Sequence, residues 1–174
     1  MSDLLQALTQ VGALKSLRRA GWVRKGLIDP ESVADHSFRM AILALVFAGD
    51  LGVDAGRLLR LVLVHDLPES DPAVGDITPF CGIDRAEKRS RERATMERLG
   101  AVLPGGDELL RLWLEYDAGE TPEADAAHQL DALEMALQSR EYEDVLGTDL
   151  SEFRESARAR IRHPALLVLL DELG

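Results

Sequence analysis

The chain has 174 residues, within the usual length of one domain, and 46% of them are hydrophobic, enough for a substantial core. Charged residues make up 29% of the chain, and together with the hydrophobic content this indicates a soluble, folded protein rather than a disordered one. No apolar run reaches the roughly 18 residues of a membrane span. The net charge of −11 argues against a nucleic-acid polymer as partner, but not against nucleotides.

Apolar residues recur along the chain at three- and four-residue spacing, and no segment alternates with a period of two. Glycine, proline and capping residues divide this pattern into helices and loops. The sequence therefore predicts a single all-α domain over residues 1–174. In chain order, the expected segments are helix 4–19 with a break at Gly21, loop 23–30, helix 30–48, helix 55–66, loop 70–79, helix 84–99, helix 107–118, helix 121–137, and a final pair of helices, 150–161 and 164–173.

The predicted helix 84–99 carries a dense alternation of Arg, Lys and Glu. Such a pattern is most often a solvated helix face, on which each salt bridge contributes little to stability. We therefore assign no functional residue to this helix.

The helix that ends near residue 66 has an apolar lead-in, residues 61–64, directly before His65-Asp66. Buried His and Asp side chains need polar partners, and a metal ion satisfies both because imidazole and carboxylate are common ligands. An adjacent His-Asp pair alone is more often an ordinary hydrogen-bonded feature of a helix. A metal site therefore requires further ligands, for which His36 and Asp131, each in its own helical segment, are the candidates.

The order of these residues, H…HD…D, resembles that of the HD-domain metal-dependent phosphohydrolases. The sequences around His36, Leu63-Val64-His65-Asp66, Gly75-Asp76-Ile77-Thr78-Pro79 and Leu130-Asp131-Ala132-Leu133-Glu134 are similar to the 5′-deoxynucleotidase branch of that superfamily. The resemblance covers about residues 14–144, and helices 150–173 would complete the bundle.

The resemblance implies a ligand set for one divalent transition metal ion: His36, His65, Asp66 and Asp131. Two imidazoles and two carboxylates suit Mn²⁺, Co²⁺, Fe²⁺, Cu²⁺ or Zn²⁺ better than Mg²⁺, which favours oxygen ligands. The sequence does not select among these ions.

The resemblance also implies roles for four further residues. Glu69 and Asp76 would be catalytic, in acid–base or water-orienting roles, and Asp76 would also lie near the sugar. Arg19 would hold the substrate phosphate and Trp22 would line the sugar pocket. The link from His65 to Asp76 is about two residues longer than we expect for the branch.

Simpler interpretations remain open for each of these residues. Glu69 would be an ordinary exposed glutamate, Arg19 a C-terminal helix residue offsetting the helix dipole, and Trp22 a packing residue. Arg18, beside Arg19, is an equally placed alternative for the phosphate.

The expected activity is hydrolysis of deoxyribonucleoside 5′-monophosphates to the nucleoside and phosphate. The alternatives are a phosphohydrolase acting on another nucleotide or small phosphoester, and a non-catalytic helical module that contains metal.

The single cysteine, Cys81, and the absence of a signal-peptide pattern indicate a cytoplasmic protein. A nucleotide is the expected partner, without membrane or nucleic-acid polymer. A homodimer is also expected, in which residues 165–170 either cover the interface or close the bundle.

Overall fold

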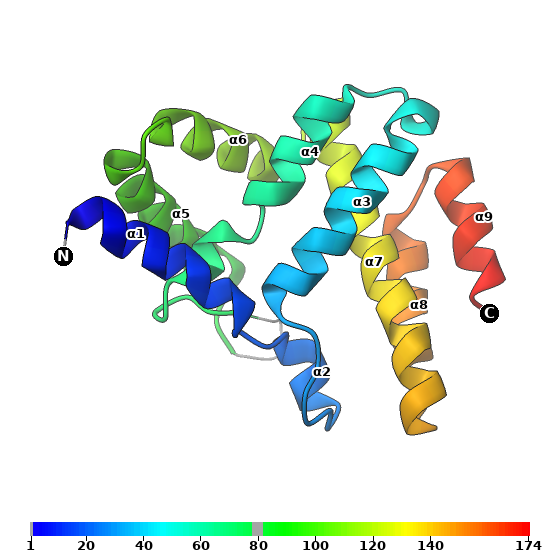
Figure 1. Ribbon diagram of the computed structural model, residues 1–174. Helices are drawn as coiled ribbons and strands as arrows, with labels where there is room; N and C mark the ends of the chain where they lie inside the picture. Colours follow the sequence, from blue (N-terminus) through cyan, green and yellow to red (C-terminus); the bar gives the residue numbers. More distant parts are fainter. Residues whose placement is uncertain (1, 78–81) are drawn as a thin grey trace. The chain divides into compact units, whose positions relative to one another are not determined.

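The computed structural model describes residues 2–77 and 82–174 (Figure 1), so Thr78, Pro79 and Cys81 lie outside the described residues. Within these ranges the regular structure is helical, and the only β-type pairing is an isolated antiparallel bridge between Arg18 and Ser32. The predicted all-α class is therefore confirmed. None of the helices in these two ranges is long and apolar enough to span a membrane.

The helices fall into two compact units, and the unit boundaries lie within α3, α4 and α6. Unit 1 comprises Met1–Phe38 and Leu63–Leu114, and unit 2 comprises Arg39–Val62 and Glu115–Gly174. Their helices, labelled in Figure 1, are α1 (Asp3–Gly12), η1 (Ala13–Lys15), α2 (Ala20–Arg24), α3 (Val33–Leu51), α4 (Ala55–Val64), η2 (Leu67–Ser70), α5 (Arg85–Val102), α6 (Gly106–Ala118), α7 (Pro122–Leu146), α8 (Ser151–Arg160) and α9 (Pro164–Glu172).

In unit 1 the short 3₁₀ helix η2 packs against α1, η1 and α5. Gln10 of α1 donates a side-chain hydrogen bond to the Ser70 hydroxyl, 3.3 Å away, and Ser70 is buried. The side chains of η2 are buried, which fixes the backbone that follows His65-Asp66.

The first helix is shorter than the sequence predicts. It ends at Gly12, and the chain then forms the turn η1 before Arg18 pairs with Ser32. Backbone hydrogen bonds from Arg19 to Glu31 and from Val33 to Leu17 hold this extended pairing, which a helix could not make. Arg19 therefore precedes α2 as its N-cap instead of ending the first helix, and Gly21 lies within α2.

The predicted helix 55–66, which is α4 in the structure, also ends early, at Val64. His65 and Asp66 therefore lie in the turn between α4 and η2. Pro68 has no N–H group, and its ring would clash with the carbonyl four residues earlier in a continuous α-helix. The chain instead restarts as η2 with Pro68 near its N-terminus. Glu69 therefore lies in η2 and not on the helix that precedes His65.

Helices α5 and α6 approach very closely at two glycines. A Cβ atom on Gly106 would lie 2.0 Å from the Gly100 carbonyl oxygen, and one on Gly100 would lie 3.2 Å from the Gly106 oxygen. A side chain at position 106 would therefore clash with the backbone of α5, whereas one at position 100 would need only a small shift of its neighbours.

In unit 2 the long helix α7 packs along α8 and α9. Thr121 caps α7 by accepting a hydrogen bond from Ala124, and Gly147 ends it in the left-handed conformation with φ +64°. Leu166 and Leu170 of α9 are buried, so residues 165–170 contribute to this bundle.

Candidate functional site

The site begins at the N-terminus of α3, where Ser32 and Asp35 cap the helix. The Asp35 carboxylate accepts hydrogen bonds from the backbone and hydroxyl of Ser32, at 2.8 and 2.7 Å, and these bonds lower the pKa of Asp35. His36 follows in the first turn of α3. The Asp35 carboxylate is thus used in the cap, which fixes the backbone that carries His36.

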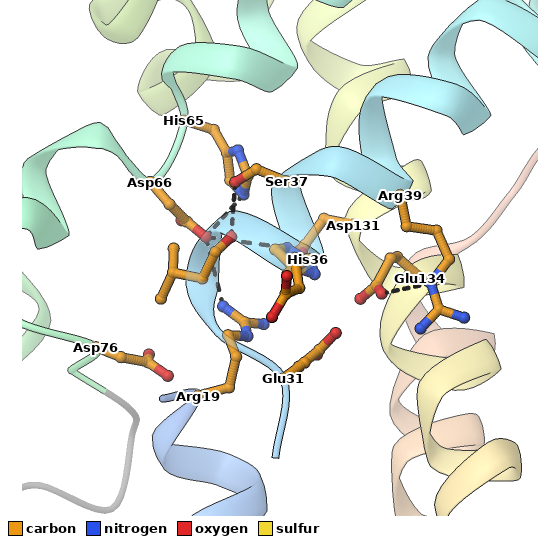
Figure 2. A network of polar contacts seen from close by, with 12 residues as sticks. Arg19, Glu31, His36, Ser37, Arg39, His65, Asp66, Asp76, Asp131 and Glu134 are labelled. Carbon is orange, nitrogen blue, oxygen red and sulfur yellow. Dashed lines mark hydrogen bonds and ion pairs between the residues drawn. The ribbon is translucent and has the colours of Figure 1, made fainter. Parts of the chain in front are cut away.

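The buried histidines His36 and His65 form a cluster with the partly buried Asp66 in unit 1 (Figure 2). The Nε2 atoms of His65 and His36 lie 2.9 and 3.9 Å from the same oxygen, Oδ2 of Asp66. The two imidazole rings are tilted by 58°, with centroids 5.4 Å apart. Two imidazole nitrogens thus converge on one carboxylate oxygen, which is a donor set that suits a transition metal.

The charge state of Asp66 follows from its neighbours. Burial by itself would raise the pKa of Asp66, but His65, Arg19 and His36 outweigh this effect and hold the pKa well below its usual range. Asp66 is therefore a carboxylate at neutral pH, as a metal ligand must be.

Arg19 and not Arg18 faces this cluster. Arg19 Nη1 lies 3.4 Å from Asp66 Oδ2, and its side chain is only 12% exposed. Arg18 pairs with Asp29, and both of those side chains are substantially exposed. The structure thus separates two arginines that the sequence leaves equivalent. It also excludes the helix-dipole interpretation of Arg19, because this residue precedes a helix.

Glu69 is buried next to the His-Asp turn, so it is not an ordinary exposed glutamate. Its Oε2 atom has no hydrogen-bond partner among residues 2–77 and 82–174. Burial, together with the charges of Asp66 and Asp76, raises the pKa of Glu69 well above its usual value, against the opposing charges of Arg19 and Lys88. A buried carboxyl group with a raised pKa beside a polar cluster is a common feature of catalytic sites.

Asp76 and Trp22 are both held near Arg19 through α2. Asp76 Oδ2 accepts a hydrogen bond of 2.6 Å from the backbone N–H of Ala20, the residue after Arg19. The Trp22 ring is fully buried, and its Nε1 donates to Glu31 over 2.8 Å. Trp22 therefore packs within unit 1, and its assignment to the sugar pocket stays a prediction.

Lys88 is a residue that the sequence analysis missed. It lies on α5, the helix expected to present a solvated face, yet its side chain is 32% exposed and its Nζ donates to the Ile77 carbonyl over 2.9 Å. Helical spacing could have indicated it, because Lys88 falls on the same face as the buried Thr95, Met96 and Leu99.

The predicted ligand Asp131 lies on α7 in unit 2. Its Oδ2 atom accepts a hydrogen bond of 2.6 Å from Arg160 of α8, and its side chain is 16% exposed. His128, three residues earlier, has its Nε2 atom 2.8 Å from the Tyr116 carbonyl, which accounts for this histidine without a metal.

Unit 2 also contains a buried carboxylate that the sequence analysis did not assign. Glu134 of α7 is fully buried and pairs over 3.0 Å with Nε of Arg39 on α3, as Figure 2 shows. The same guanidinium contacts Gln138 and Glu141, so Arg39 joins α3 to three residues of α7.

Comparison with known families shows a match to the HD domain over residues 11–166. The chain belongs to the HD-domain family. This HD-domain protein is 41% identical over 178 residues to 5′-deoxynucleotidase HDDC2 of Danio rerio, covering 100% of the chain and 88% of the relative. It is 41% identical to the Homo sapiens protein of the same name, covering 98% and 84%, and 35% identical to 5′-deoxynucleotidase hdd1 of Schizosaccharomyces pombe, covering 98% and 88%.

Solved structures share the fold of this chain. The PH0347 protein from Pyrococcus horikoshii OT3 superposes with a TM-score of 0.79 at 31% identity, covering 98% of both chains. A structure described as a predicted metal-dependent phosphohydrolase from Magnetospirillum magnetotacticum MS-1 superposes with a TM-score of 0.75 at 29% identity, covering 98% of this chain and 89% of that one. The resemblance inferred from the sequence is therefore confirmed at the level of the family.

Proposed function

We propose that this HD-domain protein is a metal-dependent phosphomonoesterase that hydrolyses deoxyribonucleoside 5′-monophosphates to deoxynucleoside and phosphate. Relatives named 5′-deoxynucleotidase match nearly the whole chain at 35–42% identity, which supports the substrate class. The observation that carries the proposal is the cluster in which His36, His65 and Arg19 all face Asp66.

His36, His65, Asp66 and Asp131 would hold one divalent transition metal ion, Mn²⁺, Co²⁺, Fe²⁺, Cu²⁺ or Zn²⁺. The first three converge in unit 1, and Asp131 is included on its place in the family's residue order. When bound, such an ion acts as a Lewis acid on a phosphate oxygen and lowers the pKa of a coordinated water.

The remaining side chains supply charge and proton transfer. Arg19 would bind phosphate oxygens, for which a planar guanidinium is well suited, and Trp22 would lie toward the sugar. Hydrolysis adds water across the P–O5′ bond, so one group takes a proton from water and another supplies a proton to O5′. Glu69 and Asp76 would share these two transfers. The raised pKa of Glu69 brings its proton exchange closer to neutral pH.

The proposal extends to location and assembly. We expect a cytoplasmic enzyme that acts on free nucleotides and binds neither membrane nor nucleic-acid polymer, in keeping with the charge of −11. We also expect a homodimer. Because α9 packs into the bundle, a better candidate interface is the exposed apolar face of α3 in unit 2, which consists of Ile42, Leu45 and Val46.

Phosphate release from a panel of deoxy and ribo 5′-mononucleotides tests this function. Metal-stripped protein would be assayed with Mn²⁺, Co²⁺, Zn²⁺ and Mg²⁺ added back in turn, with Asp66→Ala as the inactive control. We expect turnover of deoxy substrates with a transition metal and none in the variant. Protein that binds metal but releases no phosphate from any monophosphate would refute the proposal and redirect attention to other phosphoesters.

A further inference from the structure

Lys88 lies on the inward face of α5, unlike the other cations of that helix. Its side chain is 32% exposed, whereas Arg91 and Arg93 are 41% and 60% exposed and pair with glutamates along the helix. Lys88 and Glu92 lie on the same face as the buried residues Met96 and Leu99, so this face packs within unit 1.

Hydrogen bonds connect Lys88 to the residues around the proposed phosphate site. Lys88 Nζ donates to the carbonyl of Ile77, which directly follows Asp76. Asp76 in turn accepts from the backbone of Ala20, the residue that follows Arg19. Lys88 of α5 and Ala20 at the start of α2 thus contact two adjacent residues, Ile77 and Asp76.

The negative charges around Arg19 would be better balanced, once a phosphate is bound, by a second cation. The carboxyl groups of Asp66 and Glu69 interact with Arg19, and that of Asp76 interacts with Glu69. A phosphate monoester would bring up to two further negative charges. Burial lowers the pKa of Lys88, but Glu92, Glu69, Asp66 and Asp76 outweigh it and raise the pKa above its usual value. Lys88 is therefore a fixed ammonium group whose charge interacts with the same three carboxyl groups.

We propose that Lys88 is a second phosphate-binding cation of the active site and acts alongside Arg19. An ammonium group has three donor hydrogens. Among the described residues the Ile77 carbonyl accepts one of them, and Glu92 forms an ion pair with the same group at 3.5 Å. A remaining donor hydrogen would bind a phosphate oxygen. This inference rests on the proposed phosphomonoesterase function.

Lys88→Gln and Lys88→Arg test the inference, with Arg91→Gln as the matched control on the exposed face of α5. Gln retains a donor for the Ile77 carbonyl but removes the charge, whereas Arg retains the charge. For Lys88→Gln we expect KM for the deoxynucleotide and the Kd for inorganic phosphate, measured by calorimetry, to rise by roughly ten- to hundred-fold, the loss typical of one hydrogen bond to a charged group. Lys88→Arg should recover much of this affinity, and Arg91→Gln should resemble the wild type.

A purely structural role predicts a different result. Lys88→Gln would then lower the melting temperature while leaving KM and phosphate affinity unchanged, and this outcome would overturn the inference. Wild-type turnover, measured first, tests the proposed function separately. If the wild type hydrolyses no monophosphate, the phosphate titration still decides the role of Lys88, because equal affinity in wild type and Lys88→Gln, or no binding by either, refutes it.

Discussion

Arg160 of α8 donates a hydrogen bond of 2.6 Å to Asp131 of α7, so the proposed metal ligand on α7 is held by a neighbouring helix of the same unit. Arg160 also reaches the His128 carbonyl, one turn earlier on α7, over 3.5 Å. The bond to His128 fixes the Arg160 guanidinium on α7, and the bond to Asp131 orients the carboxylate without a metal ion. Partners of this kind commonly change metal affinity by roughly 10- to 100-fold when removed.

Arg160→Gln should therefore weaken metal binding by roughly 10-fold or more, because Asp131 loses the contact that orients it. Calorimetric titration of metal-stripped protein with Mn²⁺ or Zn²⁺ measures this change directly. Arg158→Gln is the matched control, since Arg158 lies on the same helix but pairs with Asp171 near the chain's end. An unchanged metal Kd in Arg160→Gln would show that the ion pair does not support the site.

Glu69→Gln should abolish turnover and stabilise the metal-stripped protein at neutral pH. The folded-state pKa of Glu69 is raised above 4.5, so wild-type stability falls as pH rises from about 4.5 toward that raised pKa, whereas the neutral amide has no such loss. Urea unfolding of both proteins between pH 5 and 8 measures the difference. Curves that stay parallel across this range would contradict a buried carboxyl group at this position.

Glu143 should make the second unit sensitive to acid. Hydrogen bonds from Arg154 lower the pKa of Glu143 and outweigh its burial, with a further bond from the Leu150 backbone. The stability it contributes is present above the unfolded value of 4.5 and is lost as pH falls through the lower folded pKa. Glu143→Gln should cost about 1–3 kcal/mol at pH 7, and the difference should shrink on acidification.

The free energy of unfolding as a function of pH checks this prediction. Asp144→Asn provides a control, because Asp144 is 64% exposed and pairs only with Arg140 among the ion pairs of the described residues. A pH-independent difference between Glu143→Gln and the wild type would rule out the ionic explanation.

Gly106→Ala should destabilise the first unit by about 1–3 kcal/mol, because the added methyl group would lie 2.0 Å from the Gly100 carbonyl oxygen and force α5 and α6 apart. Gly12→Ala serves as control, since nothing lies within 4 Å of its added Cβ, and alanine there should be neutral or slightly stabilising. Thermal and urea unfolding measure both variants. Equal stability of Gly106→Ala and the wild type would mean that the two helices do not cross as closely as described.

The assembly prediction concerns the exposed face of α3. Leu45→Glu should convert the expected dimer to a monomer, because a charge at a residue that is 56% exposed would disrupt an apolar interface without entering the core. Light scattering coupled to size-exclusion chromatography gives the mass. Val168→Glu on α9 is the control, since Val168 is similarly exposed on a different helix. If only Val168→Glu dissociates the dimer, the interface lies on α9 and not on α3.

The local sequence pattern was sufficient to predict the all-α class and many of the helix boundaries. The Thr121-Pro122 start of α7, the start of α5 near Asp84 and the final helix pair were predicted correctly, because caps, prolines and apolar spacing act within a few residues. The order of His36, His65-Asp66 and Asp131, together with the sequence blocks around them, was likewise sufficient to indicate the family.

Tertiary contacts decided what local pattern left open or misplaced. The pairing of Arg18 with Ser32 ended the first helix early and directed Arg19, not Arg18, toward Asp66. Packing of α5 turned Lys88 inward on a helix whose composition indicates a solvated face. Composition and spacing indicate which chemical groups are present and in which helices they lie. The direction in which a long side chain points depends on neighbours distant in sequence. The sequence by itself thus determined the helices and the chemical groups, and only the folded chain decided which cations and carboxylates meet.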